Sequence, residues 1–216
     1  MNQGRLKTFA AWARTYLLDA VRARAAVLGV TAKGIAPLDG EGADFIRING
    51  VIYSQPIKDQ RARLVKEVKV RGLDAVVDEV AYTWFNRLAA LRFLEVNDFL
   101  PTGVRVLSTT TEGKTEPDLL TQALAVGPTL GVKADDIHRL LDRHEEPELY
   151  RRLLTAQCNA LSEPLPFLFE RLADYSELLL PDGLLHPGGF VDKLVHGIAE
   201  EDWKQIEIVG WLYQFY

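Results

Sequence analysis

The chain has 216 residues, 48% of them hydrophobic, and a formal net charge of −5 at pH 7. This composition is typical of a globular protein with one large or two small domains, and no apolar run reaches the roughly 18 residues that cross a bilayer. A single cysteine, Cys158, excludes an internal disulfide, so we expect a reducing, cytoplasmic setting with no membrane contact.

The first half of the sequence predicts two helices around a β-hairpin. Apolar residues recur at three- and four-residue steps over residues 6–28, which indicates an amphipathic helix that stops at Gly29. A polar, glycine-rich loop follows. Residues 45–53 are then expected to form a β-hairpin, because Asn49 and Gly50 both accept the positive φ of a type I′ turn.

A basic helix is predicted from about residue 59 to residue 71, where Gly72 ends it. The next helix, at about residues 74–97, has such a wide apolar arc that we expect it to be the most buried element. Residues 101–118 read as a linker with a short extended piece at 104–107. Shorter helices are predicted over residues 117–125, 134–143, 147–161, 167–172, 175–180, 189–198 and 201–216.

The resulting fold class is mainly α, a multi-helix bundle with one small β-hairpin. Charge divides the chain at about residue 108: residues 1–108 carry 16 Lys/Arg against 11 Asp/Glu, a net +5, whereas residues 109–216 carry 9 against 19, a net −10. We therefore expect a basic helical subdomain over 1–108 and an acidic helical subdomain over 109–216, each with its own partner. Chance segregation of charge on a solvated surface is the alternative.

The basic helix is the best local indication of function. Six cations stand among residues 58–71 against only Asp59 and Glu67: Lys58, Arg61, Arg63, Lys66, Lys69 and Arg71. Cations clustered along one helix bind DNA phosphates by releasing counterions, so these six are candidate DNA contacts. An ordinary solvated charged face would have the same pattern.

No catalytic, cofactor-binding or metal-binding residue is predicted in this segment. The sequence has no glycine-rich phosphate loop, no CxxC or HExxH spacing and no Asn-Pro-Pro. Cys158 lies in an apolar helical pattern and is expected to be a buried small hydrophobe. The cluster Trp84, Phe85, Asn86 and Arg87 follows helical spacing and is expected to be structural. Its polar members should hydrogen-bond to neighbouring elements or to a partner domain. Arg92 further on should do the same, paired with Glu95 or with an acid elsewhere.

Several segments in the same order resemble the start of the PglX-type adenine-specific DNA methyltransferases of BREX phage-defence systems. The first contains the six signature residues just named, and reads AYTWFNRLAALRFLE at residues 81–95. The others are RVLS at 105–108, QCNAL at 157–161, LPFLFE at 165–170, ELLLPD at 177–182, EEDW at 200–203 and IVGWLYQFY at 208–216. One such segment would be weak, but the ordered set is specific.

This resemblance implies an enzyme that methylates the exocyclic amine of adenine in double-stranded DNA, with S-adenosylmethionine as donor. The cofactor turn and the Asn-Pro-Pro motif of that family are not in this chain, so the parent enzyme's cofactor is expected to bind downstream. The chain also stops inside an apolar helix, which leads us to expect a missing catalytic region beyond Tyr216.

Three hypotheses follow. The segment assists DNA binding while packing on the downstream methyltransferase domain; or it is an interaction module for another BREX protein or a phage inhibitor; or it is a purely structural cap.

Overall fold

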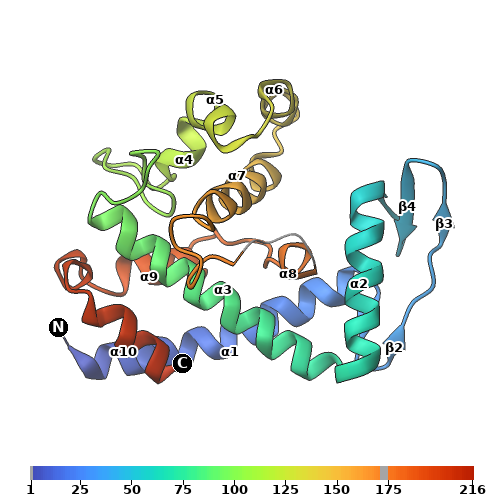
Figure 1. The fold of residues 1–216 in the computed structure, drawn as a ribbon, viewed down its shortest axis with the longest axis horizontal. Helices are drawn as coiled ribbons and strands as arrows, with labels where there is room; N and C mark the ends of the chain where they lie inside the picture. Colours follow the sequence, from blue (N-terminus) through green and yellow to red (C-terminus); the bar gives the residue numbers. More distant parts are fainter. Residues whose placement is uncertain (1, 171–174) are drawn as a thin grey trace. The chain divides into compact units, whose positions relative to one another are not determined.

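The computed structural model describes residues 2–170 and 175–216. Its α-helices are α1 (Gln3–Val27), α2 (Gln55–Arg71), α3 (Leu73–Val96), α4 (Asp118–Thr121), α5 (Ala123–Val126), α6 (Ala134–Asp142), α7 (Glu146–Ala160), α8 (Tyr175–Leu178), α9 (Phe190–His196) and α10 (Glu207–Phe215). Short 3₁₀ turns occur at η1 (Gly127–Leu130) and η2 (Glu200–Lys204). The expectation of a mainly α fold with a small hairpin is confirmed (Figure 1).

The chain forms two compact units. The first unit contains Met1–Ala13, Phe85–Arg171 and Gly183–Tyr216, and the second contains Arg14–Trp84 and Leu172–Asp182. The boundary falls inside α1 and inside α3, so these units do not follow the sequence division expected at residue 108. Each unit combines segments that are distant in sequence, whereas the net charges were counted over two continuous halves of the chain.

The second unit is built on a three-stranded antiparallel sheet covered by helix. The predicted hairpin is confirmed as β4 (Phe45–Ile48) and β5 (Val51–Ser54), joined through Asn49 and Gly50 with φ values of 50° and 78°. Along β4, Ile46 and Ile48 are buried while their neighbours are exposed, as the period of a half-buried strand requires. Helix α2 packs on β4 and β5 (Figure 1).

Three short strands lie where the sequence predicted only a loop. These are β1 (Val30–Thr31), which pairs with β2 (Gly34–Ile35), and β3 (Gly40–Glu41), which pairs with β4. Each strand has two residues, which is too short to show an alternating pattern, so sequence periodicity misses them. The hairpin turn contacts the end of α1, where the Asn49 side-chain amide donates to the carbonyls of Ala26 and Val27.

The first unit is helical among its described residues. In the part of α3 from Phe85 to Val96, every residue except Asn86 and Phe93 is buried. This confirms the expectation for the central helix. Helix α7 packs against α4 and α6, and Leu149, Leu153 and Leu154 of α7 are buried there.

Four sequence expectations differ from the structure of the first unit. The helix predicted over residues 117–125 breaks at Gln122 into α4 and α5, and the one over 201–216 breaks at Gln205, whose backbone is extended, into η2 and α10. Residues 167–170 of the helix predicted over 167–172 are turn and irregular chain, and the rest lies outside the described residues. Residues 104–107 form no strand, because the backbone N–H groups of Val106 and Leu107 donate to the Glu95 carboxylate and not to another strand.

Candidate nucleic-acid interface and a buried polar clamp

The basic helix α2 has well-defined ends. Ser54, with extended backbone, precedes it, and Pro56 stands in its first turn, where a missing N–H is tolerated. Gly72 ends the helix with φ near 85°, a conformation open to glycine, and its N–H donates to the Val68 carbonyl. Lys69 and Arg71 lie in the last turn, where the helix dipole favours cations.

The outward side of α2 presents three cations. Leu64 is buried against the sheet, whereas Arg63, Lys66 and Lys69 are exposed and follow one another at three-residue steps. Residues at this spacing lie along one side of a helix. We call Arg63, Lys66 and Lys69 the basic face. Within the described part of the chain, Lys66 and Lys69 have no ion-pair partner.

Arg61 is structural rather than part of this face. Its side chain is buried, its Nε donates to the Leu28 carbonyl at 2.8 Å, and its Nη2 donates to the Ala36 carbonyl at 2.5 Å. Burial lowers the pKa of this guanidinium. Because both carbonyls depend on it, Arg61 ties the end of α1 and the end of β2 to α2. Arg61, predicted from the sequence as a phosphate contact, is therefore buried and hydrogen-bonded within the fold, apart from the exposed cations.

The two cations at the ends of the predicted set are paired with acids. Lys58 forms an ion pair with Glu41, and Arg71 forms one with Glu79 and lies 3.8 Å from Glu67. A hydrogen bond and the charge of Glu79 raise the pKa of Arg71. These acids offset the charge of Lys58 and Arg71, which leaves the basic face as the concentrated positive surface of α2.

The signature residues are buried except Asn86, which is half-buried. In the second unit, the Trp84 indole is fully buried and donates to the Ser176 carbonyl at 2.8 Å. In the first unit, Phe85 lies with its ring centroid 4.2 Å from that of Tyr216. Arg87 is buried and donates to the Glu170 carbonyl at 2.5 Å.

One polar atom of Asn86 has a hydrogen-bond partner and another has none. Its backbone carbonyl accepts a hydrogen bond from the Tyr213 hydroxyl at 3.1 Å. Its side-chain oxygen, in contrast, is buried with no hydrogen-bond partner among the described residues. The expectation that the polar signature residues bond to neighbouring elements therefore holds for Arg87 and for the Asn86 backbone.

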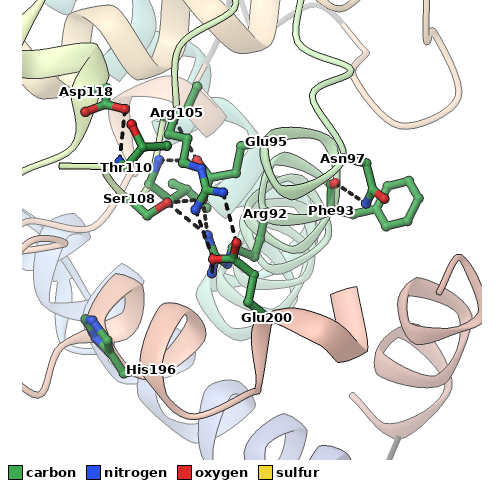
Figure 2. A network of polar contacts seen from close by, with 12 residues as sticks. Arg92, Phe93, Glu95, Asn97, Arg105, Ser108, Thr110, Asp118, His196 and Glu200 are labelled. Carbon is green, nitrogen blue, oxygen red and sulfur yellow. Dashed lines mark hydrogen bonds and ion pairs between the residues drawn. The ribbon is translucent and has the colours of Figure 1, made fainter. Parts of the chain in front are cut away.

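Arg92 and Glu95 form the centre of a buried network, shown in Figure 2. Arg92 Nη1 lies 2.7 Å from Glu95 Oε1, and both side chains are almost completely inaccessible. The Glu95 carboxylate also accepts the N–H groups of Val106 and Leu107, at 2.7 and 2.8 Å, and the Ser108 hydroxyl at 2.9 Å. Burial of such a pair is offset by hydrogen bonds to both of its members, here four to the Glu95 carboxylate and three from the two Nη atoms of Arg92.

The network continues to the protein surface through a second arginine and a second glutamate. Arg105 donates to both carboxylate oxygens of Glu200, each at 2.9 Å, and Arg92 Nη2 reaches the same carboxylate at 3.2 Å. We call Arg92, Glu95, Arg105, Ser108 and Glu200 the polar clamp. The hydrogen bond from Arg105 lowers the pKa of Glu200, and the same bond raises the pKa of Arg105.

Sequence reasoning anticipated only part of the clamp. It suggested that Arg92 pairs with Glu95 or with another acid, and both pairings occur. It gave neither Glu200 nor Arg105 a partner. The available signal was two opposite charges three residues apart in an otherwise apolar helix, which implies a buried pair but not its further partners.

The described residues offer few groups for chemistry. No cluster of three or more His, Cys, Asp or Glu side chains suited to a metal ion occurs among them, and none of the described helices is long and apolar enough to cross a membrane. Cys158 is buried in α7, as expected, and burial raises the pKa of its thiol to about 12. A thiol with that pKa stays protonated and is a poor nucleophile.

Comparison with known proteins confirms the resemblance seen in the sequence. No family model matches the chain. It is 40% identical over 223 aligned residues to the adenine-specific methyltransferase BrxX of Escherichia coli O9:H4 (strain HS), and 37% identical over 239 to the adenine-specific methyltransferase PglX of Lacticaseibacillus casei (strain Zhang). Both alignments include the whole chain but only 18% and 20% of the relatives, so the chain spans about a fifth of their length.

Proposed function

We propose that this chain, related along its whole length to part of the BrxX and PglX adenine-specific methyltransferases, is a helical module of such an enzyme whose basic face holds the DNA backbone. The observation that carries the proposal is the basic face itself: Arg63, Lys66 and Lys69 lie exposed along one side of α2. The cations around it are taken up by carbonyls or acids.

Contacts of this kind position a duplex without reading its sequence. Lysine and arginine neutralise phosphates and release counterions, which gives affinity that falls as salt rises. Hydrogen bonds to phosphates set register and orientation, whereas bases are read by groups that reach into the grooves. The module therefore contributes affinity, and the choice of site belongs to another part of the parent enzyme. Methyl transfer from S-adenosylmethionine in BREX defence belongs to that parent as well.

The test is binding of the chain to a labelled duplex across a salt series, measured by fluorescence anisotropy. For three phosphate contacts we expect a slope of log K against log salt of about −2.7. The triple variant Arg63→Glu, Lys66→Glu, Lys69→Glu should bind at least about tenfold more weakly at low salt. Unchanged binding by this variant at low salt would overturn the proposal.

The chain offers a control matched in charge. Lys7, Lys133 and Arg143 are exposed cations of the first unit, so reversing these three changes the net charge equally. If the control variant loses as much affinity as the variant of the basic face, net charge rather than the basic face explains binding.

A protein partner is the second candidate function, and charge favours it. Residues 109–216 carry a net −10, and several of the acids are exposed, among them Asp135, Asp142 and Glu145. A basic surface of another BREX protein or of a phage inhibitor would suit them. Co-purification of those partners with the chain, lost on replacing these acids by Asn or Gln, would support this function; no retention of any of them would count against it.

A further inference from the structure

The first unit contains a hollow of about 530 Å³ beside the polar clamp. It opens between the segment from Leu107 to Pro117 and helix α9, and Arg92, Arg105 and Glu200 of the clamp contribute to its wall. Its volume lies within the range of about 300–1,000 Å³ that is usual for small-molecule sites.

The wall of the hollow has an apolar side and a polar side. Helix α9 and the turn before it supply the apolar side, with Leu185, Pro187, Val191 and Val195. The polar side carries hydroxyl and cationic groups, and consists of Arg92, Arg105, Ser108, Thr109, Lys114 and Thr115. A few convergent polar groups facing an apolar surface are what orient an organic ligand in a pocket.

The arginine corner of the hollow already holds an oxyanion, the carboxylate of Glu200. Figure 2 shows this side chain reaching Arg92 and Arg105. The carboxylate side chain is 44% exposed, so an external group can approach the same corner. The Arg105 side chain, which also lines the hollow, is 17% exposed, so an approaching anion meets its guanidinium group.

Two acids in the wall of the hollow, Glu200 and Asp192, already have partners within the chain. Glu200 is held by the two arginines, and Asp192 accepts the Gly188 N–H at 2.8 Å and lies 2.8 Å from His196 Nδ1. Lys114 is exposed at the rim, near Glu116 in sequence. An incoming anion therefore meets cations at the arginine corner and at Lys114, and competes with Glu200 for the guanidinium groups.

We propose that this hollow binds an organic phosphate of nucleotide size, with its phosphate at Arg105 and Lys114 and its apolar body against Val191 and Val195. Planar guanidinium and flexible ammonium groups together suit a phosphate monoester. The site is separate from the basic face and does not depend on DNA binding there.

Isothermal titration of the chain with AMP tests the proposal. We expect saturable binding with a Kd of about 1 mM or tighter, and weaker binding of adenosine and of inorganic phosphate, each of which fills only one side of the hollow. No saturable heat with AMP, or adenosine binding as tightly as AMP, would overturn it.

Two variants locate the site. Lys114→Ala should weaken AMP about two- to fivefold, the range for a partly exposed charge pair, whereas Lys133→Ala, an exposed lysine outside the hollow, should leave the Kd unchanged. Equal behaviour of the two variants would place AMP elsewhere and overturn the proposal. Glu200→Gln removes the competing charge and should tighten AMP by a similar factor, with a thermal melt to show that the chain still folds.

Discussion

Both the basic face of α2 and the polar clamp contain arginine, but the cations of the basic face are exposed whereas Arg92 of the clamp is buried. On α2, Arg63, Lys66 and Lys69 are exposed, and their charge is directed to solvent. In the clamp, Arg92 is buried, and its two Nη atoms form ion pairs with Glu95 and Glu200. The difference teaches that an arginine in a sequence has no fixed role: burial and the acceptors around it decide whether it binds a partner or holds the fold.

The largest expected effect comes from breaking the clamp at its centre. Glu95→Ala leaves the buried Arg92 guanidinium and the N–H groups of Val106 and Leu107 without their acceptor, so the free energy of unfolding should fall by about 3–5 kcal/mol in denaturant titration. The double variant Arg92→Met, Glu95→Gln removes the unpaired charge and should recover part of this loss. A loss below about 1 kcal/mol for Glu95→Ala would show that the pair is not buried as described.

Arg61 and Arg63 sharpen the comparison within a single helix. Arg61→Ala leaves the Leu28 and Ala36 carbonyls without their donor and should cost about 1–3 kcal/mol of stability. Arg63→Ala, on the exposed side, should stay within about 0.5 kcal/mol of the parent chain and weaken DNA binding instead. Denaturant titration measures the stability of both variants, and fluorescence anisotropy measures their affinity for DNA. The reverse pattern would place Arg61, not Arg63, at the DNA.

Lys66→Ala tests the basic face one charge at a time. Loss of one phosphate contact should make the slope of log K against log salt less negative by about 0.9 while leaving the unfolding transition in place. The matched variant Lys133→Ala should leave the slope unchanged, because Lys133 belongs to the first unit and is not part of the basic face. A slope that changes equally in both variants would remove Lys66 from the interface.

The smallest expected effect is the pH dependence of the clamp. Arg105 lowers the folded-state pKa of Glu200 below its ordinary 4.5, so the contribution of Glu200 to stability is present above pH 4.5 and is lost as pH falls through the lowered pKa. Thermal melts from pH 6 down to pH 3 should therefore decline less steeply for Glu200→Gln than for the parent chain. Parallel curves for the two proteins would show that Glu200 is not stabilised by Arg105.

Much of the local structure could be predicted from particular residues. Asn49 and Gly50 marked the hairpin because few other residues accept positive φ, and Gly72 marked the end of α2 for the same reason. The apolar arc around Leu88 and Leu91 predicted the most buried helix. The strands β1 to β3 escaped prediction because pairing over two residues leaves no period to detect.

The candidate site was predicted less completely than the fold. The six cations of the basic helix were visible as a cluster, but nothing in their spacing separated Arg61 from Arg63. Arg105 and Glu200 are 95 residues apart in sequence, and no local pattern joins them. The hollow is likewise formed by segments that meet only in the folded chain.

The sequence by itself determined the helical class, the hairpin, the charge clusters and the resemblance to PglX-type methyltransferases, because propensity, periodicity and ordered motifs are properties of neighbouring residues. Only the tertiary structure decided which cations stay exposed. That outcome depends on acceptors brought from elsewhere in the chain, such as the Leu28 carbonyl for Arg61, Glu79 for Arg71 and Glu200 for Arg105. A buried guanidinium beside such an acceptor gives up water for a fixed hydrogen bond, whereas an exposed cation stays hydrated and able to meet a phosphate.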